Sequence, residues 1–323
     1  MQQTWTRRNF LTTAAAAGAG LLAARQLGAA PTSFRRKKSL IGVPSRETFE
    51  QHQAAGFDGL ESTVWECTPE AAAKDQQLAA EFGMRIHSVL RGWTDFNSPT
   101  ADKVTQDIDS VKTALRACQG YGADALLLVP CRLLAQVALP KPEEFDIEFD
   151  DRTGHLTRVV AGDNEPYTGY LQAHNEAIDM ARQALEQLIP TAEQTGVVIA
   201  LENVWSNLWV LPALFAHFVR SFQTPWIQSY FDIGNHVKYA SPEAWIEALG
   251  KTIVKLHVKD FKVDRAAPGG GEFVDIRDGD VNWPSVMRAL DQIGYDGWLT
   301  IEGSGGLSLA EQSRRLDLIL AGE

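Results

Sequence analysis

Residues 197–202 read VVIALE, and the acid that ends this run, Glu202, decides how the rest of the chain is interpreted. The run is short and rich in β-branched residues, so it predicts a buried strand rather than a helix. Three later strand-like runs also lead to a polar residue: QSYFD ends at Asp232, IVKLH at His257 and WLTIE at Glu302. Three carboxylates and one imidazole are therefore predicted at the ends of four successive strands.

The same rhythm of a short apolar run followed by a helix-like stretch extends over the chain. The predicted strands are Leu40–Val43, Gly59–Ser62, Arg85–Val89, Ala125–Val129, Val197–Glu202, Gln228–Asp232, Ile253–His257 and Trp298–Glu302. The clearest predicted helices are Pro69–Phe82, Thr100–Gln119, Leu171–Thr195 and Pro284–Ile293. Eight such units predict an α/β fold of one domain, a (β/α)8 TIM barrel. A doubly wound open sheet is the alternative, but the glycine-rich phosphate loop expected after its first strand is missing.

Residues 131–170, after the fourth predicted strand, interrupt this rhythm. EFDIEFDDRTGHLTRVV (144–160) alternates with period two around Asp151-Arg152-Thr153-Gly154 and predicts a hairpin insertion. An insertion after a barrel strand emerges on the face that carries the chemistry. We expect this insertion to be a lid, a subunit contact or a surface loop without a role. A subunit contact would be compatible with a homo-oligomer.

The first 30 residues differ in composition from the rest. Arg7 and Arg8 precede an Ala/Gly/Leu-rich run, and the first acid is Glu47. This pattern predicts a twin-arginine signal peptide (1–30) ahead of a barrel at 31–323, and hence export to the periplasm or the extracellular space. The run is short and alanine-rich for a membrane anchor, so no stable membrane partner is expected. Loss of residues 1–30 removes three arginines and no acid, which changes the net charge from −11 to −14. Such an acidic surface opposes a nucleic-acid partner.

In a parallel barrel, functional side chains lie at the carboxyl ends of the strands. Because the strands that carry Glu202, Asp232, His257 and Glu302 are consecutive, the four side chains are expected to form one half-ring. Alternation places Glu202 on the same strand face as Val198 and Ala200, and a buried carboxylate there needs a partner or a metal. Three oxygen ligands and one nitrogen suit Mn²⁺, Mg²⁺ or Co²⁺, and Zn²⁺ also fits.

The motifs ALENVW, YFDIGNH, KLHVKDF, DGDVNW and LTIEGS, in this order and spacing, resemble those of the xylose isomerase-like TIM barrels, the sugar phosphate isomerase/epimerase group. Within that group they are similar to hexulose-phosphate isomerases and inosose dehydratases. The resemblance covers essentially the whole chain after residue 30. It implies that Glu202, Asp232, His257 and Glu302 are metal ligands, with Glu202 and Glu302 also acting as catalytic acid and base.

The reaction class so implied is proton transfer next to a carbonyl, through an enediolate stabilised by a divalent ion. Export disfavours a phosphorylated substrate, so we expect a metal-dependent isomerase or epimerase of a free sugar. The alternative is a lyase, hydrolase or dehydratase that acts on 3-keto-glycosides or inososes through the same site. A sugar-binding barrel without catalysis would not need paired acids. An endonuclease of this fold would need more than seven histidines and a basic groove.

Further residues near these strand ends are candidates for substrate binding. Lys259 either binds a substrate hydroxyl or pairs with Asp260. The residues that follow the predicted ligands in the chain, Asn203, Asn235 and His236, either orient the substrate or a ligand, or form hydrogen bonds within local turns. Aromatic and imidazole groups assigned to the third strand's end either form a pocket wall or pack in the core. The predicted substrate-binding residues are Lys259, His236, Asn203, Asn235, Trp93 and His87. GGGEF (269–273) is expected to be a mobile loop.

Two positions depart from the related ketose 3-epimerases. Those enzymes have a substrate-contacting histidine three residues after the metal aspartate, where this chain has Asn235, with His236 one step later. They also keep an arginine six residues past the metal histidine, where this chain has Val263; Lys262 and Arg265 are the nearby substitutes. These departures favour a substrate other than a simple ketose.

Overall fold

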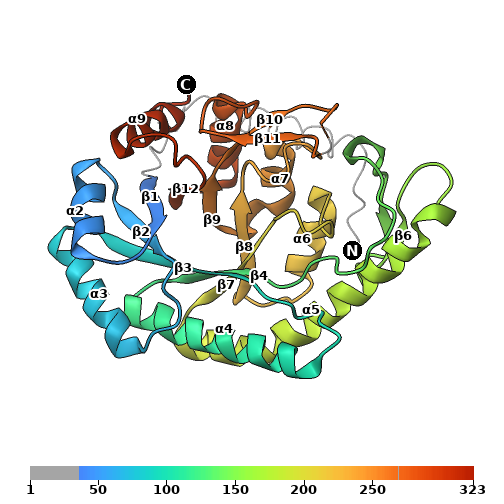
Figure 1. Cartoon of the computed structure of the whole chain (residues 1–323), viewed down its shortest axis with the longest axis horizontal. Helices are drawn as coiled ribbons and strands as arrows, with labels where there is room; N and C mark the ends of the chain where they lie inside the picture. The colour runs from blue at the N-terminus through green and yellow to red at the C-terminus, as the bar shows by residue number, and fades with distance from the viewer. Residues whose placement is uncertain (1–35, 268) are drawn as a thin grey trace, which may run out of the picture. The chain divides into compact units, whose positions relative to one another are not determined.

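The computed structural model describes residues 36–267 and 269–323, and in this part of the chain eight parallel strands close into a barrel surrounded by helices (Figure 1). Going round the barrel, the strand order is β1-β12-β9-β8-β7-β4-β3-β2. The barrel strands are β1 (Lys37–Gly42), β2 (Gly59–Ser62), β3 (Arg85–Trp93), β4 (Ala125–Val129), β7 (Val198–Glu202), β8 (Ile227–Asp232), β9 (Ile253–Val258) and β12 (Trp298–Ile301). The predicted (β/α)8 barrel is confirmed.

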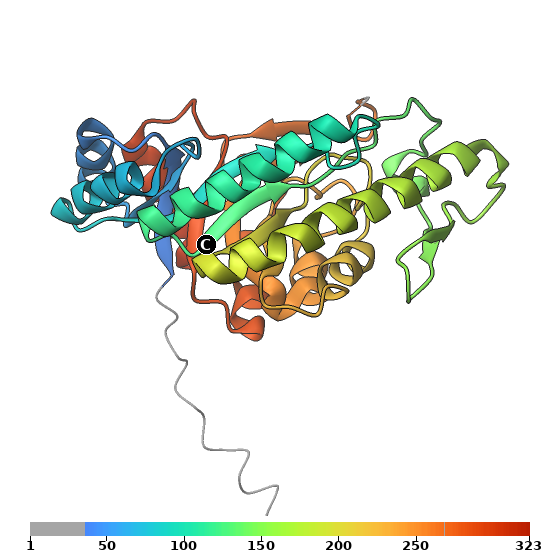
Figure 2. The same cartoon turned by 90° about the horizontal axis from the view of Figure 1, so that it is seen from below.

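Each barrel strand is followed by a helix of the outer layer. The helices are α2 (Arg46–Ala54), α3 (Pro69–Glu81), α4 (Ala101–Tyr121), α5 (Thr168–Thr195), α6 (Pro212–Arg220), α7 (Pro242–Leu249), α8 (Trp283–Ile293) and α9 (Leu309–Leu320). The long helices α4 and α5 lie side by side, as Figure 2 shows from below. Local chemistry sets their ends: Thr68 caps α3 ahead of Pro69, and Gly122 ends α4 in the left-handed region at φ 67°.

Strand alternation divides the apolar side chains into two cores. A small inner cluster fills the barrel with Ala125, Leu127, Val129, Ala200 and Tyr230. A much larger cluster lies between the strands and the helices. Because Ala200 points inward, alternation turns Glu202, two residues later on the same strand, toward the inside as well. The sequence predicted that Ala200 and Glu202 share one face of this strand, and the structure shows that this face is the inner one.

The third strand is longer than predicted. It was expected to end at Val89, but β3 continues to Trp93, where it still pairs with Val129. The register shifts between Leu90 and Gly92, and Gly92 adopts φ 71°, which a residue with a Cβ rarely does. A glycine bulge thus carries the strand past the point where its apolar run stops.

Two short ribbons extend from the carboxyl face of the barrel. In the insertion after β4, β5 (Glu148–Phe149) and β6 (Leu156–Arg158) pair antiparallel, which confirms the predicted hairpin. After β9, β10 (Asp260–Val263) pairs with β11 (Gly271–Val274). The expectation that 269–273 forms a mobile loop is therefore wrong for its second half, because the backbone of 271–273 is hydrogen-bonded into this ribbon.

The predicted signal peptide, residues 1–30, lies outside the described residues. Within the described residues, the structure contains no helix with the length and apolarity needed to cross a bilayer. The three cysteines are free thiols, and Cys118 and Cys131 are buried.

Candidate metal centre

The four polar residues predicted at the strand ends come together at the carboxyl mouth of the barrel. Their strands are neighbours in the order β7-β8-β9-β12, so the side chains form a half-ring. Asp232 and His257 are directly paired across β8 and β9, and Thr300 pairs with His257, which places Glu302 just above. One ligand atom from each of Glu202, Asp232, His257 and Glu302 lies within 4.8 Å of the others.

His257 lies at the centre of this group. Its Nδ1 is 2.9 Å from Oε2 of Glu302, 3.4 Å from Oε1 of Glu202 and 3.9 Å from Oδ2 of Asp232. The side chains of Asp232 and His257 are buried, whereas that of Glu302 is 30% exposed. The group is therefore closed on the barrel side and open to solvent at Glu302.

Three of the atoms in this group lack a hydrogen-bond partner among the described residues. They are Oδ2 of Asp232, Nδ1 of His257 and Oε2 of Glu302. The last two lie 2.9 Å apart and form an ion pair when His257 is protonated. Buried polar atoms are rarely left without a partner, since each costs about 1–3 kcal/mol. Three such atoms, close to one another, fit a cation that all of them would coordinate.

The electrostatics of the group agree with this fit. Burial raises the pKa of Asp232 well above its ordinary value and also raises the pKa of Glu202. Burial acts in the same direction on Glu302, but the positive charges of His257 and Lys259 outweigh it and lower the pKa of Glu302. Three carboxylates at this depth need more positive charge than one histidine and one lysine supply, and a divalent cation would supply it.

The other ring nitrogen of His257 has a partner that the sequence did not reveal. Nε2 lies 2.9 Å from Oε2 of Glu61, a residue of β2 on the far side of the barrel with 0% exposure. The hydroxyl of Tyr230 donates to the same Glu61 oxygen at 2.5 Å. A carboxylate bonded to the distal nitrogen of a metal-binding histidine fixes its tautomer and its ring orientation. Glu61 and Tyr230 thus hold Nδ1 of His257 toward the cluster.

We expect the variant Glu61→Gln to bind a divalent cation about 10- to 100-fold more weakly, because the amide no longer fixes the charged or tautomeric state of His257. Titration of the purified protein with Mn²⁺, followed by calorimetry, measures this change. The matched control is Glu50→Gln on the exposed side of α2, which should leave the affinity unchanged. An affinity in Glu61→Gln equal to that of the wild type would contradict this role.

Asn203, Asn235 and His236 surround Asp232. The backbone N–H of Asp232 donates to Oδ1 of Asn203 at 2.8 Å, and Nδ2 of Asn203 donates to the carbonyl of Asp232 at 3.0 Å. The backbone N–H of Asn235 donates to Oδ1 of Asp232 at 2.7 Å. These bonds orient the Asp232 carboxylate. The substrate contacts predicted for the three residues stay a prediction.

His236 is enclosed by aromatic side chains. It is 2% exposed, its ring lies 4.7 Å from that of Trp245, and its Nδ1 lies 3.0 Å from Nδ2 of Asn203. Burial lowers the pKa of His236 to about 3, so the ring is neutral and Nδ1 accepts from the amide of Asn203. His236 therefore supports Asn203, which in turn holds Asp232.

Lys259 lies at the open side of the cluster. Its ammonium is 3.2 Å from Oε1 of Glu302 and 3.9 Å from Oδ2 of Asp232. The alternative pairing with Asp260 is not seen, because the carboxylate of Asp260 accepts from the backbone of Phe261, Arg277 and Val281 instead. Lys259 thus lies where a substrate oxygen bound beside Glu302 would find a donor.

His87 is not one of the four residues of the cluster, and its Nε2 lies 3.2 Å from Oγ1 of Thr300, the residue that pairs with His257 across β12 and β9. It was expected near the end of the third strand, but β3 runs six residues beyond it, so this expectation is wrong. Its Nε2 lies 2.9 Å from Oγ of Ser39, and its ring stacks on Trp298 at 4.2 Å, near the starts of β1 and β12. The His87 side chain is fully buried.

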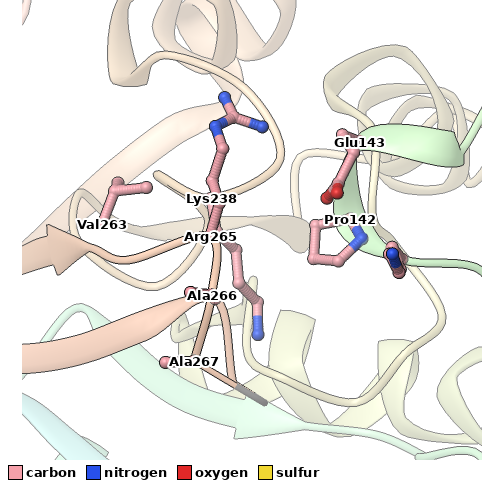
Figure 3. Close-up of a pocket in the computed structure, with 9 residues that line it drawn as sticks. Pro142, Glu143, Lys238, Val263, Arg265, Ala266 and Ala267 are labelled. Carbon is pink, nitrogen blue, oxygen red and sulfur yellow. The ribbon is translucent and has the colours of Figure 1, made fainter.

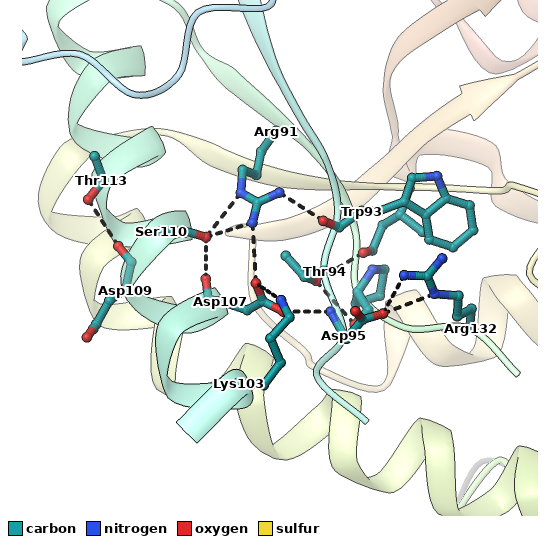
Figure 4. A network of polar contacts seen from close by, with 12 residues as sticks. Arg91, Trp93, Thr94, Asp95, Lys103, Asp107, Asp109, Ser110, Thr113 and Arg132 are labelled. Carbon is teal, nitrogen blue, oxygen red and sulfur yellow. Dashed lines mark hydrogen bonds and ion pairs between the residues drawn. The ribbon is translucent and has the colours of Figure 1, made fainter. Parts of the chain in front are cut away.

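Trp93, at the end of β3, does lie on the carboxyl face, where it is 41% exposed. Figure 4 shows the polar network that fixes this end of the strand. Asp107 accepts from Lys103 at 2.6 Å and from the backbone N–H of Asp95 at 2.8 Å, and Arg132 pairs with Asp95. The Arg132 guanidinium lies 5.1 Å from the Trp93 ring centre, so this contact orients the indole while part of its surface remains exposed to solvent.

A closed barrel with a cluster of metal-ligating groups at the carboxyl ends of its strands has the architecture of a TIM-barrel enzyme. A profile of the xylose isomerase-like TIM barrel family matches residues 49–317. The chain belongs to this family.

Curated relatives match part of the chain. An L-ribulose-5-phosphate 3-epimerase of Escherichia coli is 32% identical over 134 residues, 41% of this chain and 45% of that protein. An uncharacterized protein of Methanocaldococcus jannaschii is 28% identical over 134 residues, 40% of this chain and 44% of that protein. The matched region thus spans less than half the length of these relatives.

Solved structures show the same fold over nearly the whole barrel. A D-tagatose 3-epimerase-like protein has a TM-score of 0.65 at 19% identity and covers 88% of this chain and 97% of its own. The 3-keto-D-glucoside 4-epimerase of Escherichia coli has a TM-score of 0.62 at 13% sequence identity, and the match covers 88% of this chain and 99% of that one. The IOLI protein with a bound zinc atom has a TM-score of 0.62 at 16% sequence identity, and the match covers 88% of this chain and 96% of that one.

Proposed function

We propose that this protein is a divalent-metal-dependent sugar isomerase or epimerase that transfers a proton next to a carbonyl of a non-phosphorylated sugar. The observation that carries the proposal is the convergence of Glu202, Asp232, His257 and Glu302, with three buried atoms that lack a hydrogen-bond partner among the described residues. The family and the epimerase names among its relatives support the reaction class.

The same four residues would hold the ion. Three carboxylates and one imidazole suit Mn²⁺, Mg²⁺ or Co²⁺, and the zinc atom in the IOLI protein supports Zn²⁺ as a further candidate. When bound, a divalent ion polarises the sugar carbonyl and lowers the cost of the negative charge that develops on its oxygen.

The protein's own groups would then move the proton. Glu202 and Glu302 come from β7 and β12, the two ends of the half-ring, so they flank a substrate bound at its centre. One carboxylate removes the proton on the carbon next to the carbonyl, and the other returns a proton to the opposite face or to the neighbouring carbon. Lys259, 3.2 Å from Glu302, donates to a substrate oxygen at the open side.

A second candidate is a lyase or dehydratase that acts on 3-keto-glycosides or inososes through the same enediolate. This candidate is favoured because the histidine and the arginine of the related ketose 3-epimerases are replaced here by Asn235 and Val263. The neighbouring His236 does not replace the missing histidine directly, since its ring is buried against Trp245. In this reaction the enediolate expels a leaving group on the next carbon instead of taking up a proton.

Metal removal and isotope exchange test these proposals together. Purified protein should contain about one divalent ion per chain, lose its activity in chelator and regain it with Mn²⁺. In deuterated water, an epimerase or isomerase places deuterium in a ketose, whereas a lyase releases the aglycone of a 3-keto-glycoside. Protein that carries no ion and keeps its activity in chelator would refute the metal-dependent mechanism.

We also propose that the chain is exported by the twin-arginine pathway to the periplasm or beyond, and that its partner there is a small carbohydrate. The support is the Arg7-Arg8 pattern followed by the Ala/Gly/Leu-rich run. Cell fractionation that finds the full-length, uncleaved chain in the cytoplasm would contradict export.

A further inference from the structure

A cavity of about 370 Å³, whose lining Figure 3 shows, shares no residue with the metal cluster. Pro142 and Glu143 of the insertion line one side. Val263 and Ala266, at the tip of the β10–β11 ribbon, line the other side, together with Lys238 from the loop after β8. Its volume falls within the about 300–1,000 Å³ range of small-molecule sites.

The walls of this cavity are packed against one another. Gly270, in the ribbon, comes so close that a Cβ on it would lie 3.8 Å from Cγ of Pro142 and 3.3 Å from Cδ of Lys238. Phe145 of the insertion packs on Tyr239 with ring centres 5.9 Å apart. The insertion, the ribbon and the loop after β8 therefore form one structure on the carboxyl face of the barrel.

The chemistry of the walls is mixed. Lys141, Lys238 and Arg265 supply N–H donors, and within the described part of the chain none of them forms an ion pair. Glu143 supplies an acceptor, and Val263 with the two neighbouring alanines supplies apolar surface. Donors and acceptors on an otherwise apolar wall suit a ring that carries hydroxyl groups.

Aromatic side chains connect the metal cluster to this cavity. The Phe273 ring, on β11, is 40% exposed and lies 4.4 Å from the ammonium of Lys259, which itself contacts Glu302. The Phe273 ring also packs on Trp205, with ring centres 4.9 Å apart, and on Phe261, with ring centres 5.2 Å apart. Lys238, in the cavity wall, lies 3.3 Å from the centre of the Trp205 ring. An exposed aromatic ring, held by its neighbours, thus lies between the two sites.

We infer that the substrate is a glycoside with two rings, the first bound at the metal cluster and the second stacked on Phe273 and reaching the cavity beside Lys238 and Arg265. This inference rests on the proposed function and narrows its substrate class. The apolar face of a sugar or phenyl ring packs well on an exposed aromatic side chain. A free monosaccharide at the cluster would leave both Phe273 and the cavity unused.

Calorimetric titration of the full chain with three matched ligands tests this inference without catalysis. Methyl β-D-glucoside has one ring, whereas phenyl β-D-glucoside and cellobiose add an aromatic or a sugar ring at the same position. We expect the two-ring ligands to bind about tenfold more tightly than the methyl glucoside. Phe273→Ala should weaken both of them about tenfold, and Arg265→Ala should weaken cellobiose alone. The control Leu134→Ala changes an exposed residue of the insertion that does not line the cavity, and it should change none of the affinities.

Equal affinity for the three ligands, or no saturable binding of either two-ring ligand, would overturn the inference. So would affinities for both two-ring ligands that are unchanged in Phe273→Ala. These outcomes differ from failure of the proposed function, which is read from metal content and deuterium exchange. If the wild-type protein exchanges deuterium into free ketoses but binds the one-ring and two-ring ligands equally well, the function stands and the second-ring site falls.

Discussion

Replacing Glu302 by glutamine is expected to lower the rate of proton exchange by about 10²- to 10⁴-fold while the barrel stays folded. The amide keeps the size of the side chain but can neither take up a proton nor offer a charged ligand to the cation. Glu302 is the most exposed member of the cluster, so the change costs little core packing. Deuterium incorporation into the substrate and the metal content of the purified variant measure the two effects separately.

The matched control for this variant is Glu247→Gln, an exposed acid on α7, which should retain the rate and the metal content of the wild type. If Glu302→Gln kept the wild-type exchange rate, Glu302 would be neither an acid nor a base in the reaction. If it kept metal but lost exchange, the proton-transfer role would stand apart from ligation.

Replacing Trp245 by alanine is expected to lower the free energy of unfolding by about 3–5 kcal/mol. Trp245, on α7, is 1% exposed and packs on Phe231 of β8 and on Phe215 of α6, with ring centres 6.3 Å apart in both cases. Its indole N–H has no hydrogen-bond partner among the described residues, so the loss is one of packing. Since His236 also rests on this ring, metal affinity should fall as well. Urea denaturation and Mn²⁺ titration measure the two changes.

Trp93→Ala serves as the control for size and residue type, because Trp93 is 41% exposed. Its expected cost is about 0.5 kcal/mol or less. A Trp245→Ala variant no less stable than Trp93→Ala would mean that the space between α7 and β8 closes after the change. Unchanged metal affinity would show that support of Asp232 does not depend on this aromatic layer.

The sequence was sufficient for those parts of the site that depend on local pattern. Glu202, Asp232 and His257 each follow an apolar run, and the repeated strand–helix rhythm places such ends on one rim of a barrel. Alternation also predicted that Ala200 and Glu202 share one strand face, although not that this face is the inner one. These inferences use only neighbours in the chain and the symmetry of a parallel barrel.

Glu61 shows why the rest could not be predicted. It lies in a four-residue strand, GLES, with nothing nearby to distinguish it from a surface acid, and its partner His257 is 196 residues away. Only closure of the barrel brings β2 opposite β9. The predicted position of His87 near the end of its strand was wrong for a related reason. The strand extends through a bulge at Gly92, so the end of the apolar run is not the end of the strand.

The sequence by itself determined the barrel, the order of its strands' polar ends and the residue types that gather at its mouth, because these follow from periodicity and residue type. The tertiary structure decided which of the polar residues meet, which are enclosed as supports, and how the insertion and the β10–β11 ribbon line a cavity that shares no residue with the cluster. The physical reason is that burial and orientation depend on contacts between segments far apart in the chain, and such contacts leave no local pattern.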